Sequence, residues 1–176
     1  MLLQLFNCNC NGYNYNYKPG KHPRTYGKTM YSSRFTIAVH TLLCIERFRK
    51  EYKITSDFIA GSVNVNPVII RRVIGQLKKA GLVTTEAGVG VAGTDLARDP
   101  SEISLADVFL AVEDDGPLFR FHEQPNPACP VGKSIHHVLG SRLDHLEKTM
   151  MDELAETKLS DLRADADIYL AEAPQN

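Results

Sequence analysis

Hydrophobic positions spaced three and four residues apart predict two helices at the start of the patterned part of the chain. The first covers about residues 33–50, and Ser32 or Ser33 can cap it. The second is shorter and begins at Thr55 or Ser56, with Asp57 near the positive end of its dipole. The positions expected to face the core are Phe35, Ala38, Val39, Leu42, Leu43, Ile45, Phe58, Ile59 and Val63.

The stretch NPVIIRRVIGQLKKAG, residues 66–81, predicts a third helix with a marked start and end. Asn66 can cap it, Pro67 suits its first turn, and Gly81 can take a left-handed conformation beyond its end. At 100° per residue, the side expected to face inward carries Ile69, Ile70, Val73, Ile74, Leu77 and Ala80. The opposite side carries Val68, Arg71, Arg72, Gly75, Lys78 and Lys79. All four basic residues of this helix therefore share one face.

The pattern then changes to short β-branched segments, residues 82–85 and 94–97, which predict a two-stranded hairpin. The glycines between these segments are Gly88, Gly90 and Gly93. Ser104 and Asp107 come close to a capping box and begin a fourth helix, which runs to about residue 113. Short helices followed by a capped basic helix and a hairpin are typical of a winged helix-turn-helix domain. The predicted fold is therefore mainly α with a small β-hairpin.

A second part of the chain follows a linker at residues 114–130, which four prolines and a glycine should keep irregular. Apolar residues then recur every three or four positions from 131 to about 157, which predicts a helix about 40 Å long. They are Val131, Ile135, Leu139, Leu143, Leu146, Met150 and Leu154. A second copy of the chain is the simplest partner for this stripe, and folding back onto the first domain is the alternative. Residues 159–170 predict a short terminal helix, so residues 131–176 form a dimerisation helix and tail.

Charge is unevenly distributed although the net charge is only -1. Residues 31–98 hold ten Lys and Arg against five Asp and Glu, whereas residues 99–176 hold six against sixteen. This asymmetry suggests that the first half of the chain, the predicted domain at residues 31–113, faces a polyanion. Chance clustering of solvated charges is the alternative.

Residues 1–30 carry no acidic residue and no hydrophobic periodicity, so we expect a disordered tail. Met30 as the natural start is an equally good explanation of this segment. No apolar run approaches the length of about 20 residues that a membrane span needs, and a signal peptide is not expected. The cysteines are Cys8, Cys10, Cys44 and Cys129. Their spacing fits neither a zinc site nor a disulfide framework, so we expect a protein of the reducing cytoplasm.

Several segments together resemble the Rrf2 family of bacterial winged-helix transcriptional regulators. They are SSRFTIAVHTLL from residue 32, TSDFIAGSVNVNPVIIRRVIGQLKKAGLV from residue 55, GVGVAGTDLARDPSEISLADV from residue 88 and NPACPVG from residue 126. The resemblance covers about residues 30–157. It implies a homodimer in which each protomer inserts its third helix into a major groove of DNA and places its wing near a minor groove.

The resemblance also implies roles for single residues. Ser33 and Arg34 fall where the family contacts backbone phosphate, and Gly88 to Gly93 fall on the wing tip. Asn66, Pro67, Val68, Arg71 and Arg72 fall on the recognition helix, and Gly75, Lys78 and Lys79 complete its basic face. The wing has fewer glycines than is usual in the family, which puts deep insertion of the wing in doubt. The resulting prediction is a repressor on a palindromic operator; the alternative is a winged-helix module for protein assembly.

The linker sets this chain apart from cluster-binding members of the family. Those members have three cysteines before the long helix, whereas residues 114–133 contain only Cys129. A [2Fe-2S] cluster needs four ligands, so we expect no cofactor. Cys129 precedes a helix N-terminus, which lowers a thiol pKa and suggests a redox or electrophile sensor. A small apolar residue at a tight turn is the alternative. Cys44 is expected in the core.

Enzymatic chemistry is not indicated. His136 and His137 are adjacent on a helix, point about 100° apart and do not easily share a metal ion. No nucleophile–base pair, phosphate loop or paired carboxylate occurs at a meaningful spacing, so the prediction is a regulator without catalytic activity.

Overall fold

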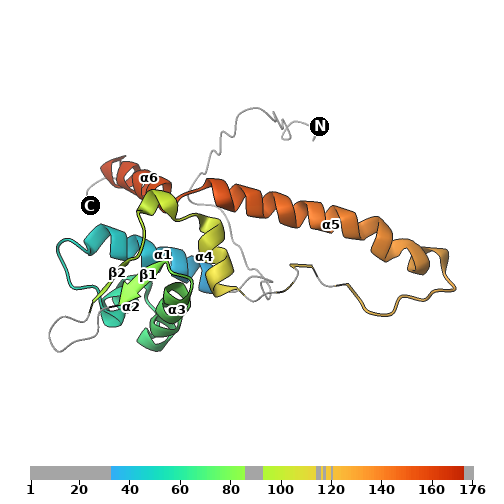
Figure 1. Ribbon diagram of the computed structural model, residues 1–176, viewed down its shortest axis with the longest axis horizontal. Helices are drawn as coiled ribbons and strands as arrows, with labels where there is room; N and C mark the ends of the chain where they lie inside the picture. The colour runs from blue at the N-terminus through green and yellow to red at the C-terminus, as the bar shows by residue number, and fades with distance from the viewer. Residues whose placement is uncertain (1–32, 86–92, 114–115, 117, 120, 173–176) are drawn as a thin grey trace, which may run out of the picture. The chain divides into compact units, whose positions relative to one another are not determined.

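The computed structural model describes residues 33–85, 93–113, 116, 118–119 and 121–172 of the 176-residue chain. Within these residues it contains six α-helices, one short 3-10 helix and a two-stranded antiparallel sheet (Figure 1). The elements are α1 (Arg34–Phe48), α2 (Ser56–Val63), α3 (Pro67–Lys79), β1 (Val83–Thr85), β2 (Thr94–Leu96), η1 (Pro100–Glu102), α4 (Leu105–Val112), α5 (Pro130–Glu156) and α6 (Leu159–Glu172). The predicted mainly α fold with a small hairpin is confirmed.

The predicted caps explain where α2, α3 and α4 begin. The Thr55 side chain accepts from the Phe58 N–H at the start of α2, and the Asn66 side chain accepts from the Val68 N–H at the start of α3. Ser104 and Asp107 form a full capping box at α4. These side chains satisfy backbone donors that have no partner within a helix, so the helix boundaries follow local sequence.

Two turns frame α3. Gly81 has a φ of +70°, as expected for a glycine just beyond a helix. Asn64, at the end of α2, is the other described residue with a positive φ, at 57°, and its short polar side chain tolerates this conformation. The α2–α3 connection is therefore tight, which is the geometry of a helix-turn-helix.

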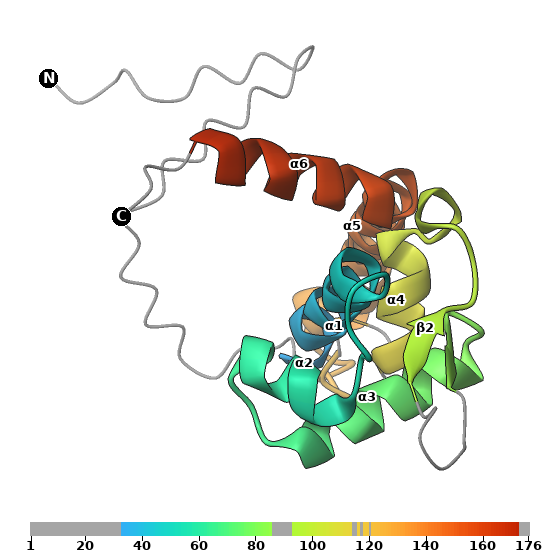
Figure 2. The ribbon, with the colours of Figure 1, turned by 90° about the vertical axis from the view of Figure 1, so that its left-hand side faces the viewer.

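A single hydrophobic core joins α1, α2, α3, α4 and the hairpin. Figure 2 shows α1 between α6 on one side and α2 and α3 on the other. The residues that are almost completely buried include Leu42, Ile45, Ile59, Ile70, Leu77, Leu82, Ile103 and Val108. Removing each such side chain from water contributes about 1.5–3 kcal/mol, so the amphipathic faces, more than helix propensity, hold the domain together.

The inward face of α3 is narrower than the helical wheel predicts. Ile70, Val73, Ile74 and Leu77 are buried as expected, but Ile69 is 39% exposed and Ala80 is also exposed. Both lie at one margin of the apolar arc, next to the exposed basic side of the helix. The prediction that these two residues face the core is wrong.

The long helix α5 buries none of its residues within the single chain. Its C-terminal end joins the rest of the domain, since Leu105 N–H donates to the Thr157 carbonyl and Ser104 bridges to Lys158. In Figure 1 its N-terminal part lies beyond the other helices. Apart from Pro130, which begins α5, the described residues of the predicted linker lie in no helix or strand. No described helix is long and apolar enough to cross a membrane.

Candidate nucleic-acid interface

The exposed face of α3 displays the basic residues together, as the sequence predicts. Arg71, Arg72, Lys78 and Lys79 are all exposed, and Val68 beside them is 48% exposed. Gly75 lies in the middle of this face, where an added Cβ would meet nothing within 4 Å. We call this set of six residues the basic face. Another molecule can therefore approach the α3 backbone closely at Gly75.

The four cations of the basic face differ in how they are held. The Arg71 Nε donates to Ser56 Oγ at 3.2 Å, and its guanidinium lies 3.7 Å from the Asp57 carboxylate. The Lys78 Nζ donates to Thr85 Oγ1 at the base of the hairpin. Arg72 and Lys79 have no side-chain hydrogen bond or ion pair among the described residues. These two side chains can therefore pair with an anion without breaking an existing contact.

The contacts of Arg71 and Lys78 bring three elements to one side of the domain. A hollow of about 300 Å³ lies between α2, α3 and the strands, lined by Ser56, Arg71, Thr85 and Gly93 among others. Of the predicted wing-tip residues, Gly93 lies immediately before β2, whereas Gly88 and Gly90 lie outside the described residues. The base of the hairpin thus adjoins the basic face.

Two predicted phosphate contacts lie at the start of α1. Ser33 is its N-cap residue by position, but its side chain makes no capping hydrogen bond. The Arg34 guanidinium lies 3.5 Å from the Glu113 carboxylate, just after α4. That pair is partly exposed and is worth at most about 1 kcal/mol, so it competes only weakly with a phosphate. Neither the Arg34–Glu113 pair nor the Arg71–Ser56 contact has a signal in the sequence, because the partners lie far apart along the chain.

Cys129 lies at the junction of the linker and α5, where it is exposed. Its N–H donates to the Asn126 carbonyl, while the Asn126 side chain accepts from the Ala128 N–H. A Cβ at Gly132 would collide with the Asn126 carbonyl oxygen, so the NPACPVG turn requires glycine there. The backbone N–H groups of Gly132 and Val131 donate to the thiol and lower its pKa.

A pH experiment tests this effect on Cys129. Because hydrogen bonds stabilise the thiolate, more of it is present at neutral pH than in an unfolded chain. We expect alkylation of Cys129 by iodoacetamide to reach half its maximal rate at a lower pH in the native protein than in urea, measured by mass spectrometry of its peptide. Cys44 is buried, and burial raises the pKa of its thiol, so it should stay unmodified in the native protein. Equal midpoints for Cys129 in both states would contradict the expectation.

The predicted dimer stripe is accessible along α5. Val131 and Leu146 are 66% and 55% exposed, Leu139 is also exposed, and the other predicted positions, Ile135, Leu143, Met150 and Leu154, are half-buried. Val138, a further exposed apolar residue, is not among the predicted positions. We refer to the seven predicted positions as the α5 stripe. It is an apolar surface that the described residues of the single chain cover only in part.

A metal centre is not formed by the described residues, among which no group of three or more His, Cys, Asp and Glu side chains could hold an ion. His136 contacts the His122 carbonyl and lies beside the Phe121 ring at a tilted angle, but these groups do not assemble with Cys129 into four ligands. The residues of the linker therefore do not fit a [2Fe-2S] cluster.

Comparisons with known proteins agree with this geometry. The model of the Rrf2 family, described as an iron-dependent transcriptional regulator, matches residues 31–165. YwnA of Bacillus subtilis, named as an HTH-type transcriptional regulator, is 44% identical over 133 residues, which cover 76% of this chain and 96% of YwnA. YffB of Lactococcus lactis, also named as an HTH-type transcriptional regulator, is 28% identical over 131 residues, covering 73% and 83%.

Solved structures give the same picture. A crystal structure described as that of a DNA binding protein is 40% identical, with a TM-score of 0.60, and the match covers 74% of this chain and 98% of that one. IscR of T. potens is 22% identical, with a TM-score of 0.61, covering 83% and 93%. CymR of B. subtilis, described as the global cysteine regulator, is 19% identical, with a TM-score of 0.55, covering 76% and 95%. The last two likenesses concern the fold alone.

Proposed function

This chain belongs to the Rrf2 family of transcriptional regulators, and we propose that it is a homodimeric repressor that binds a palindromic operator through the basic face of α3. It is a DNA-binding regulator and not an enzyme, as its family and relatives are. The observation that carries the proposal is that Arg72 and Lys79 have no side-chain partner within the described part of the chain and lie on an exposed helix face with Gly75 at its centre.

Each part of the basic face has a proposed role. Arg72 and Lys79 neutralise phosphates or read a guanine edge, and Val68 is exposed where it can contact a thymine methyl. The Asn66 and Pro67 cap fixes the start of α3, and Arg71 and Lys78 join it to α2 and to the hairpin. Ser33, Arg34 and the wing glycines add contacts to the sugar-phosphate backbone of the DNA. This division assigns positioning to some residues and sequence reading to others.

Selection of genomic DNA fragments by the purified protein tests the proposal. We expect enrichment of one palindromic sequence whose half-sites are separated by about one helical turn, because two symmetric protomers each present one α3. Binding without sequence preference at moderate salt would instead favour the alternative function, a winged-helix module for protein assembly.

The proposed dimer uses the α5 stripe. A helix that buries no residue in its own chain yet repeats apolar residues over seven turns needs a partner, and a second copy presents an identical surface. On this view residues 31–113 bind DNA, residues 114–130 form a linker, and residues 131–176 comprise the dimerisation helix and a C-terminal tail.

The signal is proposed to be oxidative and to act at Cys129. Its exposure and lowered pKa give it the properties of a reactive thiol, and it lies at the start of the helix that carries the stripe. We expect hydrogen peroxide to release the wild-type protein from its operator in an electrophoretic assay, and Cys129→Ser to stay bound. Cys44→Ser, at a buried thiol, is the matched control and should respond like the wild type. Release of Cys129→Ser by peroxide would remove Cys129 from the proposal.

A further inference from the structure

Two contacts from α2 hold one edge of the Arg71 guanidinium. The Nε atom of Arg71 donates to Ser56 Oγ at 3.2 Å, and its Nη2 atom lies 3.7 Å from the Asp57 carboxylate. In a planar guanidinium Nε and Nη2 face one side, whereas Nη1 and Nη2 together form the outer end. That outer end has no partner among the described residues. Two parallel N–H donors of the exposed Arg71 are therefore open to another molecule.

The partners of Arg71 lie in the first turn of α2, which is firmly placed. The helix begins at Ser56, and the Thr55 side chain caps it by accepting from the Phe58 N–H. Figure 2 shows α2 and α3 side by side. On α3, Arg71 directly follows Ile70, which is completely buried. Because the core fixes both helices, the two contacts favour one placement of a side chain that otherwise has many rotamers.

The position of Asp57 is unusual for a surface that meets DNA. Asp57 is exposed, and a carboxylate beside such a surface opposes the approach of a polyanion. The positive end of the α2 dipole favours an acid at this position, but that effect does not depend on Arg71. An ion pair between two exposed groups contributes little to the stability of the free domain. It becomes stronger where DNA excludes water from it, so the pair serves the complex more than the fold.

The open end of the Arg71 guanidinium matches one base in the major groove. Guanine presents two neighbouring acceptors there, O6 and N7, which two parallel N–H donors can contact together. Adenine presents an amino donor in place of O6, so the same two donors discriminate against it. Arg71 lies in the first half of α3, and helix-turn-helix proteins contact base edges with the N-terminal residues of this helix. A phosphate contact carries no such base preference.

We propose that Arg71 reads a guanine in each half-site and that Ser56 and Asp57 are positioning residues for this contact. The guanine contact rests on the proposed function, to which it adds the base that is read and the residues that act through Arg71. One edge of the guanidinium joins α3 to α2, and the other end donates to O6 and N7. Because the side chain is ordered before DNA binds, less conformational entropy is lost in the complex.

Selection from random-sequence duplex DNA by the full chain and by Arg71→Ala tests which base is read. The wild type should enrich a palindrome with a G·C pair at one position of each half-site. Arg71→Ala should lose the preference at that position and keep it at the others. An unchanged preference in Arg71→Ala, or a preference for another base at the position it relaxes, overturns the guanine contact and leaves the palindrome intact. No enrichment by the wild type overturns the proposed function itself.

A modified base measures the contact directly. The base 7-deazaguanine pairs with cytosine but lacks the N7 acceptor, so in place of that guanine it removes one of the two hydrogen bonds. We expect fluorescence anisotropy to show at least about tenfold weaker binding of the modified duplex by the wild type. Arg71→Ala should bind the two duplexes equally. An equal loss in both proteins would place another residue at N7 and overturn the contact.

Asp57→Asn tests the positioning role. We expect its preference for guanine over the other bases to fall by about threefold or more, because the charged partner of Arg71 is lost. Its affinity for unrelated duplex DNA should stay equal or rise, because a carboxylate that repels phosphates is removed. Asp165→Asn removes the same charge from an exposed position on α6 and, as the matched control, should keep the preference. A lower Tm with an unchanged base preference in Asp57→Asn would mean that Asp57 serves only the α2 dipole, and would overturn its positioning role.

Discussion

Arg72→Ala is expected to weaken operator binding by at least about tenfold, with no loss of folded structure. Arg72 is exposed on α3 and has no side-chain partner among the described residues, so its truncation breaks no contact within the domain. Alanine also favours helix more than arginine does. The full loss therefore falls on the complex with DNA, where a bidentate contact to guanine is worth about 1–3 kcal/mol.

The salt dependence of that loss identifies what Arg72 contacts. If each Arg72 of a dimer neutralises one phosphate, the slope of log affinity against log salt falls by about 1.8 for two lost contacts. If it reads a base, the operator loses more affinity than unrelated DNA does. Fluorescence anisotropy at several salt concentrations measures both quantities.

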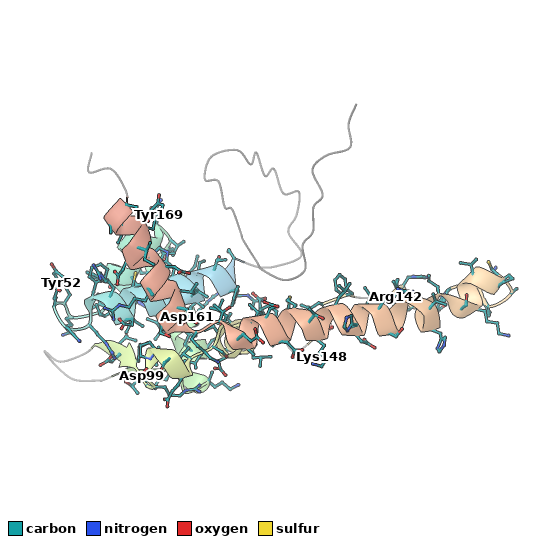
Figure 3. All side chains as sticks on the ribbon, turned by 90° about the horizontal axis from the view of Figure 1, so that it is seen from above. Tyr52, Asp99, Arg142, Lys148, Asp161 and Tyr169 are labelled. Carbon is teal, nitrogen blue, oxygen red and sulfur yellow. The ribbon has the colours of Figure 1, made fainter. Side chains whose placement is uncertain are left out.

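Lys148→Ala is the matched control for Arg72→Ala. Lys148, labelled in Figure 3, is an exposed cation on α5. It pairs with Asp152. Its removal changes the net charge of the protein by the same amount, so equal effects of the two variants would mean that only total charge matters. Operator affinity unchanged in Arg72→Ala would show that the basic face is not the DNA-binding surface. A melted circular-dichroism spectrum would contradict the claim that Arg72 has no structural role.

The DNA-binding half of the fold was predictable because its signals are local. The cap at Asn66, the left-handed Gly81 and the capping box at Ser104 each involve residues within four positions of one another. Such motifs set helix boundaries without contacts to distant parts of the chain. The basic face followed from the same helical geometry. The error on α3 lies on its inward face, where the exposed Ile69 and Ala80 are at the margin of the apolar arc.

Contacts between distant segments could not be predicted. Arg34 meets Glu113, 79 positions later, and Glu46 meets Arg163, 117 positions later. A charged residue on a helix gives no indication of which distant charge it will face, because charges are ordinarily solvated. The docking of α6 on α1 therefore appears only in three dimensions. The same reason explains why the sequence could not distinguish Arg71, which Ser56 holds, from Arg72.

Leu146→Glu is expected to dissociate the proposed dimer. Leu146 is 55% exposed in the single chain and lies near the middle of the α5 stripe, so symmetry buries two copies of it in the dimer. Full burial of one leucine contributes about 1.5–3 kcal/mol, and an interfacial glutamate adds the cost of burying a charge without a partner. We expect the dimer dissociation constant to rise at least about a hundredfold, measured by sedimentation equilibrium. Glutamate is a good helix former, so α5 itself should persist.

Ser141→Glu separates the loss of the interface from the gain of charge. Ser141 is exposed on the side of α5 opposite the stripe, and the same new charge there should leave the dimer intact. A monomeric Leu146→Glu protein should bind a single half-site with the affinity of the wild type. It should not show the higher affinity that the wild-type dimer has for the full palindrome, because only a dimer presents a second α3 to the second half-site at a high effective concentration. A Leu146→Glu protein that remains dimeric would mean that α5 meets something other than a second α5. In that case the stripe would have to be covered by another part of the chain, and the palindrome would no longer follow from it.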